Sequence, residues 1–379
     1  MSFIADQQTL EDLNIPGRFK NNSVFRLFDQ VCTNGGRKLL DDMFRHPLTQ
    51  PDEINRRSDT FRYFGKKALT FPFVEDDFSV LEDYLGTQAG SSLPGVAASI
   101  IRKKIAAVIT RGIAYSLLET ALRQTITALC VFHDFIGPLL QDTDNPAREQ
   151  LLAVYKIYGD KRLQSLLAAR DKEKLTLWEV IRFDHLLRVS LREEMWVLTE
   201  FVFELDVNIA VSGVAVARGF CYATALQRTE NVLHIGGLYH PSLRNAVPNN
   251  LAISQQSNVL FLTGANMAGK STLMKSLGIA VYLAHIGFPI AAGSMEFSVK
   301  DGLFSSINVP DDLGHGYSHF YAEVLRVKKV AEAVSAGKDL IVIFDELFKG
   351  TNVKDAYDAT LAITEAFSEN RNCFFIIST

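Results

Sequence analysis

Cysteine is scarce in this chain, and the spacing of its few cysteines excludes a metal site built from them. The 379 residues include four cysteines, far apart in sequence and without metal-ligand spacing: Cys32, Cys130, Cys221 and Cys373. This pattern excludes a cysteine-based metal site. We predict buried free thiols in a reducing compartment, which is the cytoplasm.

The chain also lacks a strong charge of one sign and a targeting segment. Its net charge of −4 gives no overall electrostatic signature of a nucleic-acid-binding protein, so any DNA contact must come from a local patch. The first residues have neither the basic start nor the apolar run of a signal peptide. The stretch 276–295 contains no Lys, Arg, Asp or Glu, but Gly287, Pro289 and Gly293 interrupt it. A membrane span is therefore the worse explanation, and we predict no membrane association.

The first 232 residues show mostly helical patterns. Thr33 and Asn34 offer N-cap chemistry before an apolar stripe that Pro47 ends, and Asp52 can start the next helix. The Gly- and Ser-rich segment 86–94 predicts a loop. Long amphipathic segments follow over residues 100–135, 146–169 and 175–211. We predict an all-α domain over residues 1–232.

The pattern changes near residue 232. Short apolar runs flanked by Gly and Pro alternate with helical segments, which predicts a three-layer α/β domain over residues 233–379. The last apolar run, 373–377, is typical of a parallel strand, and the chain stops two residues later. Ligands of open α/β sheets bind beyond the carboxyl ends of strands, so we expect the chain to be truncated at this end of the domain.

One motif indicates a phosphate-binding loop. It fits G-x-x-x-x-G-K-[ST] and consists of Gly264, Ala265, Asn266, Met267, Ala268, Gly269, Lys270, Ser271 and Thr272. The run 259–262 before it predicts a buried strand, and the residues after it predict a helix whose N-terminus faces the phosphates of a nucleotide. Lys270 would contact the β- and γ-phosphates, and the Ser271 hydroxyl would reach Mg²⁺.

Two carboxylates follow a second apolar run. The segment 340–344 predicts a strand, and Asp345 and Glu346 come directly after it. A strand of this kind after a phosphate-binding loop places its first acid near Mg²⁺. The second acid is then positioned to act as a base toward the attacking water. We therefore predict Asp345 as a metal ligand and Glu346 as catalytic.

A Gly-rich segment, 311–323, lies between these two motifs. Its backbone and the Ser318 hydroxyl could cap an anion, and its place in the chain is that of the signature loop of ABC-type ATPases.

These motifs together resemble the MutS family of DNA mismatch repair proteins. The match is most specific in the phosphate loop, where the Asn266–Met267 pair is characteristic of that family. His240–Pro241 resembles the pair that opens the family's ATPase domain, and 286–292 resembles the stretch after its first helix. Other similar segments are 311–323, 345–355, 33–40, 46–48, 54–57 and 204–206.

The resemblance implies a helical core and lever domain followed by an ABC-type P-loop ATPase domain, with ATP and Mg²⁺ as ligands. His240 would bind nucleotide, and the ATPase domains would pair in a homodimer. Ser318 of one subunit would then be catalytic, capping the γ-phosphate of ATP held by Lys270 of the other. DNA is the expected partner, but the family's N-terminal mismatch reader has no counterpart here. Hydrolysis is expected to be weak in a truncated chain.

Two other functions stay open. A nucleotide-gated structural or interaction protein would hydrolyse little ATP and would not recognise mismatches directly. A small-molecule kinase would need lid arginines, and Arg326 is the one arginine between Lys300 and Lys338. The basic residues Arg102, Lys103, Lys104, Arg111 and Arg123 predict either a solvated helix surface or a face that contacts DNA phosphates.

Overall fold

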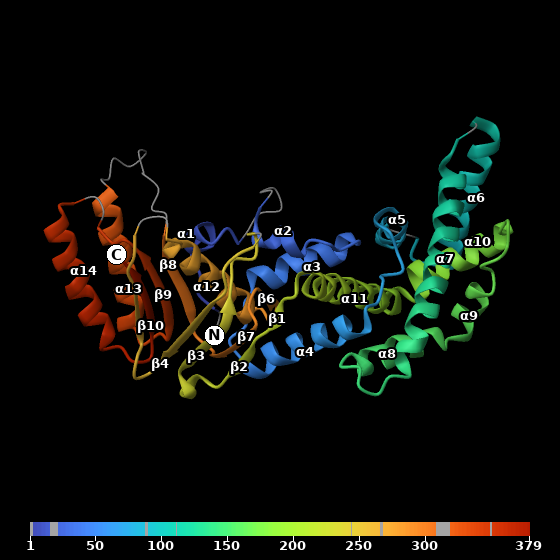
Figure 1. Ribbon diagram of the computed structural model, residues 1–379. Helices are drawn as coiled ribbons and strands as arrows, with labels where there is room; N and C mark the ends of the chain where they lie inside the picture. The colour runs from blue at the N-terminus through green and yellow to red at the C-terminus, as the bar shows by residue number, and fades with distance from the viewer. Residues whose placement is uncertain are drawn as a thin grey trace. The chain divides into compact units, whose positions relative to one another are not determined.

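The structure is a computed structural model that describes residues 3–15, 22–87, 90–110, 112–243, 245–265, 268–307, 319–348 and 351–379. Its contacts divide the chain into two compact units (Figure 1). Unit 1 comprises Met1–Gln30, Asp41–Gly65 and Ala210–Thr379, and unit 2 comprises Val31–Leu40 and Lys66–Ile209. The chain is therefore a multidomain protein with a helical part and an α/β part. The functional boundary between residues 232 and 233 stays a prediction.

Unit 2 is built from helices. It contains α5 (Glu75–Gly86), α6 (Leu93–Thr110), α7 (Ala114–Leu140), α8 (Arg148–Tyr158), α9 (Lys161–Leu167), α10 (Leu177–His185) and the π-helical turn η1 (Leu186–Ser190). Three further helices contribute residues to both units: α3 (Asn34–Arg45), α4 (Pro51–Lys67) and α11 (Arg192–Arg218). The helices predicted before Pro47 and after Asp52 are confirmed. The segment 100–135 instead belongs to two helices, with Gly112 between them, because glycine is a poor helix former.

Asp206 joins two distant segments of unit 2. Its buried carboxylate accepts hydrogen bonds from the Thr33 backbone N–H and the Thr33 hydroxyl, both at 2.7 Å, and from Cys32 N–H at 3.0 Å. The Thr33 hydroxyl in turn accepts the Gly36 N–H at 2.9 Å, as expected of an N-cap of α3. Burial raises the pKa of Asp206, and these hydrogen bonds offset part of that rise. A single carboxylate thus fixes the start of α3 against α11.

The main sheet of unit 1 is parallel and four-stranded, in the order β5 (Val259–Leu262), β10 (Phe374–Ser378), β9 (Leu340–Asp345), β8 (Gly302–Ser306). Helices α13 (His319–Ser335) and α14 (Val353–Ser368) cover one face of it. Helix α12 (Lys270–His285) and the short α1 (Gln7–Asp12) pack on the other face (Figure 1). This arrangement confirms the predicted three-layer order around the sheet.

The core of this sheet is apolar on both faces. Val342 and Phe375 pack with Val330 of α13 and Phe367 of α14, and the rings of Phe367 and Phe375 stack at 4.9 Å. Strand β5 differs from its predicted full burial, since Phe261 is 47% exposed. The reason is its place at the edge of the sheet, where it pairs with β10 on one side.

A second sheet of unit 1 has the order β2 (Thr224–Leu226), β7 (Ser294–Ser298), β3 (Val232–Leu238), β4 (Asn249–Ser254), and β1 (Cys221–Tyr222) pairs with β6 (Pro289–Ile290). The short helices α2 (Val24–Phe28) and η2 (Arg228–Glu230) complete the elements. The apolar stretch 276–295 therefore forms part of α12, a turn and short strands. Among the described residues, no helix combines the length and apolar character needed to cross a membrane.

All four cysteines are free thiols. Cys130 and Cys373 are buried, as predicted, whereas Cys32 and Cys221 are only half-buried. Burial raises the pKa of the Cys221 thiol to about 11, so that this sulfur is a poor nucleophile at neutral pH.

His285, the last residue of α12, is a fully buried neutral imidazole. Its Nδ1–H donates to the carbonyl of Val281 at 2.8 Å, and its Nε2 accepts the backbone N–H of Lys300 at 3.1 Å. Burial lowers the pKa of His285 from 6.5 to about 4, and the charge of Lys300 adds to this effect. Protonation would also remove the acceptor that the Lys300 N–H uses.

We expect acid to destabilise the fold through His285. Because its pKa is lower in the folded state than in the unfolded chain, the unfolded state binds more protons between pH 6.5 and 4, and stability falls as the pH falls through this range. Denaturant unfolding at pH 7 and pH 5 should differ by about 2 kcal/mol from this group. The His285→Gln variant should lose that part of the pH dependence, while His46→Gln, at an exposed histidine, should keep it. Equal pH dependence in all three proteins would contradict this role.

Candidate nucleotide-binding site

The loop between β5 and α12 has the backbone that its glycines allow. Gly264 has φ +152° and Gly269 has φ +94°, both in the region that favours glycine. The Ala268 N–H donates to the carbonyl of Ala265 at 3.1 Å, which closes a turn inside the loop. Asn266 and Met267 lie outside the described residues. The predicted order of strand, loop and helix is confirmed.

Lys270 is the first residue of α12, and its ammonium group lies among oxygen atoms. Nζ donates to the carbonyl of Gly264 at 2.7 Å and to the carbonyl of Thr379 at 2.8 Å. The carboxylate of Glu346 lies 4.0 Å away. The side chain of Lys270 is only 11% exposed, so its charge is held in one place at the N-terminal end of the helix.

The acidic pair follows β9, at the same end of the sheet. Asp345 is buried and accepts a hydrogen bond from the Ser378 hydroxyl. The Glu346 N–H donates to the carbonyl and the hydroxyl of Ser378, both at 3.2 Å. Glu346 has φ +49°, a left-handed conformation that turns the chain sharply after the strand. Its carboxylate is 32% exposed and therefore within reach of water.

The strand register brings these residues to one level. Ser378 pairs with Leu262 of β5 on one side and with Asp345 of β9 on the other. The carboxyl ends of the three parallel strands therefore meet at one edge, where ligands of open α/β sheets bind. Ser271 and Thr272 follow Lys270 in the first turn of α12, with Ser271 exposed and Thr272 half-buried. The Ser271 hydroxyl and the Asp345 carboxylate are hard oxygen donors of the kind that Mg²⁺ prefers.

His240 occupies a half-buried position after β3. Its Nδ1 accepts the Ser242 N–H at 3.3 Å. Burial lowers the pKa of His240, and the nearby charge of Lys275 lowers it further. The imidazole is therefore neutral at pH 7, and it lies near Lys275 of α12. Its predicted contact with nucleotide stays a prediction.

Two predicted features have different outcomes. Ser318 and the Gly-rich loop 311–318 lie outside the described residues, so their role stays a prediction. Arg326 is described, and it is not available as a kinase lid arginine. Its side chain is 4% exposed and is held by Asp6 and the carbonyl of Ser305.

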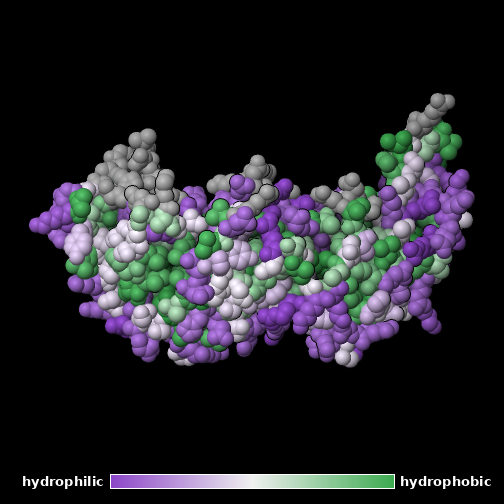
Figure 2. Space-filling model, in the orientation of Figure 1, coloured by the Kyte–Doolittle hydropathy of each residue, from purple (hydrophilic) through white to green (hydrophobic). Residues whose placement is uncertain are grey.

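The predicted basic surface of unit 2 is mixed in character. Arg102 and Arg123 are exposed, while Lys104 lies over the ring of Tyr115 at 5.2 Å. Arg111 is not among the described residues. Figure 2 shows apolar side chains where α6 ends and α7 begins, and the exposed ones include Ile105, Val108, Ile109, Ile113 and Leu117. Both interpretations of the basic residues, a face that contacts DNA phosphates and a solvated helix surface, stay predictions.

Sequence reasoning missed Ser378 as a site residue. Its hydroxyl donates to the Asp345 carboxylate and accepts the backbone N–H of Glu346, yet its only sequence signal is its place after the apolar run 373–377. It also missed Asp6, which carries no motif.

The part of the chain that contains this site is similar to known proteins. Residues 260–379 match the family described as MutS domain V. The chain is 29% identical over 244 residues to the DNA mismatch repair protein MutS of Petrotoga mobilis, covering 62% of this chain and 30% of that protein. It is 34% identical over 185 residues to MutS of Symbiobacterium thermophilum, covering 47% and 21% of the two chains. It is 32% identical over 222 residues to MutS of Thermus thermophilus, covering 58% and 25%. The matches thus span less than a third of the length of these relatives.

Proposed function

We propose, from the premise that this chain is MutS-like, that it binds Mg²⁺–ATP at a site shared between two subunits and couples ATP hydrolysis to DNA binding. The relatives are named as DNA mismatch repair proteins, so mismatch repair is the first candidate process, with recombination as the alternative. The observation that carries the proposal is the position of the Lys270 ammonium between the carbonyl oxygens of Gly264 and Thr379 and the carboxylate of Glu346.

The phosphate end of the nucleotide would lie at the N-terminus of α12. Backbone N–H groups of the loop and the helix dipole favour an anion at this point. The Lys270 ammonium now interacts with two carbonyl oxygens, and the β- and γ-phosphate oxygens would replace them as stronger, charged acceptors. The adenosine side of the site would include His240.

The metal donors fit Mg²⁺ in their chemistry, because both are hard oxygen atoms. Asp345 and Ser271 would hold the ion, and Mg²⁺ when bound neutralises charge on the phosphates. The Ser378 hydroxyl donates to Asp345 and so keeps one carboxylate oxygen in place.

Glu346 would act on the attacking water. The two hydrogen bonds from its N–H to Ser378 fix its backbone, and its partly exposed carboxylate projects within 4.0 Å of Lys270. A carboxylate at this distance from the phosphate-binding cation can accept a proton from a water aligned with the γ-phosphate.

The alternatives differ in strength. The kinase hypothesis loses its only candidate lid arginine between Lys300 and Lys338, since Arg326 is engaged elsewhere. A nucleotide-gated interaction protein with little hydrolysis is the second candidate, because the relatives match only in part. Binding of mismatched, branched and plain duplex DNA, measured at stated salt with and without ATP, separates the mismatch, recombination and DNA-independent roles.

A mixing experiment tests the shared site. The Ser318→Ala and Lys270→Ala variants should each be inactive alone, and mixing them should restore activity. A mixed dimer has one site with both defects and one intact site. Since about half of the dimers in an equal mixture are mixed, about a quarter of the parental turnover should return.

The control for this experiment is Ser335→Ala, an exposed serine at the far end of α13. It should be active alone. If Ser318→Ala is inactive and mixed dimers are verified by co-purification of differently tagged subunits, failure to recover activity contradicts a shared site. A Ser318→Ala variant with nearly full turnover would reduce Ser318 to a helix cap, worth about 1 kcal/mol of stability.

A further inference from the structure

The N-terminal segment 3–15 adds to the edge of the main sheet. The Ile4 N–H donates to the carbonyl of Asp301 at 2.8 Å, and the Leu303 N–H donates to the carbonyl of Ile4 at 2.9 Å, so that Ile4 forms a parallel bridge beside β8. The approach is close enough to exclude a side chain. A Cβ on Gly302 would lie 2.5 Å from the carbonyl oxygen of Ile4.

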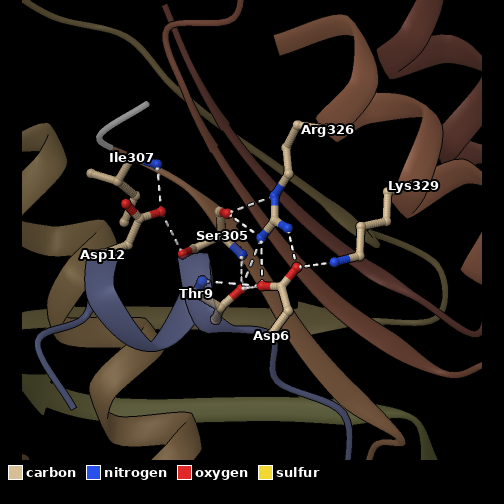
Figure 3. A network of polar contacts seen from close by, with 7 residues as sticks. All are labelled: Asp6, Thr9, Asp12, Ser305, Ile307, Arg326 and Lys329. Carbon is tan, nitrogen blue, oxygen red and sulfur yellow. Dashed lines mark hydrogen bonds and ion pairs between the residues drawn. The ribbon is translucent and has the colours of Figure 1, made fainter. Parts of the chain in front are cut away.

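Beyond this bridge, two polar side chains of the segment, Thr9 and Asp12, hold the carboxyl end of β8 (Figure 3). Ser305 N–H donates to the Thr9 hydroxyl at 3.0 Å. The Asp12 carboxylate accepts the Ser305 hydroxyl at 2.7 Å and the Ile307 N–H at 3.0 Å. Thr9, Asp12 and Ser305 are all buried.

The same segment also holds α13. Asp6 accepts hydrogen bonds from both terminal nitrogens of Arg326 and pairs with Lys329 at 2.6 Å. Arg326 Nη2 also donates to the Thr9 hydroxyl at 2.8 Å, and Arg326 Nε donates to the carbonyl of Ser305 at 3.0 Å. Figure 3 shows Asp6 between the two basic side chains, with Ser305 beside them.

In this network the negative charge of Asp6 is paired with the positive charges of Arg326 and Lys329. Burial alone would raise the pKa of Asp6, but the hydrogen bonds from Arg326, Lys329 and Thr9 hold it well below its ordinary value. Asp6 is therefore ionised at neutral pH. A fork of two hydrogen bonds between carboxylate and guanidinium fixes orientation as well as distance.

The network contacts the two elements that lie on either side of one connection in the chain. Residues 308–318 run from the end of β8 to the start of α13, and Ser318 is the last of them. Ile307, at one described end of that connection, and Arg326, in the helix that begins at its other end, are both held by one short segment from the N-terminus.

We propose that segment 3–15 is a positioning element of the ATPase, which sets β8 and α13 relative to one another and, through these two elements, what its own subunit contributes to the partner's site. The inference rests on the proposed function. Asp6, Thr9 and Asp12 are positioning residues, because they act through Ser305, Ile307 and Arg326 and not on the nucleotide.

The Asp6→Asn variant tests this role. Asparagine is also a good N-cap, so the cap that Asp6 gives α1 is retained while the charge paired with Arg326 is lost. We expect turnover to fall about tenfold or more, because small displacements of a catalytic group are costly, and ATP affinity to stay unchanged. Asp12→Ala removes the acceptor of Ile307 by a different route and should give the same result.

Mixing separates positioning from general destabilisation. Asp6→Asn should regain turnover when mixed with Lys270→Ala, and should not regain it when mixed with Ser318→Ala. A merely structural loss would lower the melting temperature and the fraction of binding-competent protein, and neither mixture would recover. The matched control is Glu11→Gln, since Glu11 is an exposed acid of α1 whose side chain accepts from Gln7 at 2.8 Å.

The outcomes are distinct from those of the proposed function. If Ser318→Ala and Lys270→Ala restore each other but Asp6→Asn and Asp12→Ala turn over at the parental rate, the positioning role is overturned and the shared site stands. Recovery of Asp6→Asn with Ser318→Ala instead of Lys270→Ala also overturns it, because the defect would then lie in the site of its own subunit. If the parent chain does not hydrolyse ATP, the proposed function itself fails.

Discussion

The Lys270→Ala variant is expected to lose tight ATP binding. The Lys270 ammonium lies 4.0 Å from the Glu346 carboxylate, and Lys270 begins the helix that faces the phosphates. Removing one partner of a close charge pair costs about 2–5 kcal/mol, which weakens binding by about 30-fold or more. Titration of a fluorescent ATP analogue into both proteins, in the presence of Mg²⁺, measures the difference.

The control is Lys328→Ala. Lys328 is an exposed lysine of α13 that pairs with Glu332 at 3.8 Å, so the variant loses the same charge without touching the site. Both variants should keep the parental melting temperature within a few degrees, because neither lysine is part of the apolar core. Unchanged ATP affinity in Lys270→Ala would remove the basis of the nucleotide-site assignment.

The second large effect is expected from Glu346→Gln. Glutamine keeps the size of the side chain and the left-handed backbone of this position, but it cannot accept a proton from water. Loss of a general base slows the chemical step by about 10²- to 10⁴-fold, while ATP binding through Lys270 should remain. Single-turnover hydrolysis and equilibrium binding, measured on the same sample, separate the two steps.

Glu365→Gln is the matched change on α14, at an exposed glutamate away from the strand ends. It should hydrolyse ATP at the parental rate. A Glu346→Gln protein that turns over as fast as this control would exclude Glu346 as the base.

The strands and the loop of the site were predictable because their signals are local. Continuous apolar runs give β5, β9 and β10, and the glycines of the loop occur where positive φ is required. An apolar run predicts a strand, but it does not show whether that strand lies at the edge or in the centre of the sheet. Phe261 belongs to an apolar run like that of Phe344, yet it is half exposed because β5 is an edge strand and β9 is central.

The contacts that sequence reasoning missed are polar, single and long-range. Asp206 and Thr33 lie 173 positions apart, and Asp6 and Arg326 lie 320 positions apart. No periodicity links one carboxylate to one distant donor, since periodic patterns arise from repeated burial along a single element. The resemblance to MutS placed residues 33–40 and 204–206 in one domain, but the carboxylate that joins them needed the structure.

The place of segment 3–15 at β8 also has a consequence for biosynthesis. Thr9 and Ser305, which are hydrogen-bonded to each other, are separated by 296 positions. At about 5–20 residues per second, the ribosome needs about 15–60 s to make the second after the first. During that time the segment has no edge to join, whereas β8 meets a segment that is already made when it emerges. The contact between segment 3–15 and β8 is therefore strongly non-local, and pairings of this kind slow folding because a long loop must close before they form.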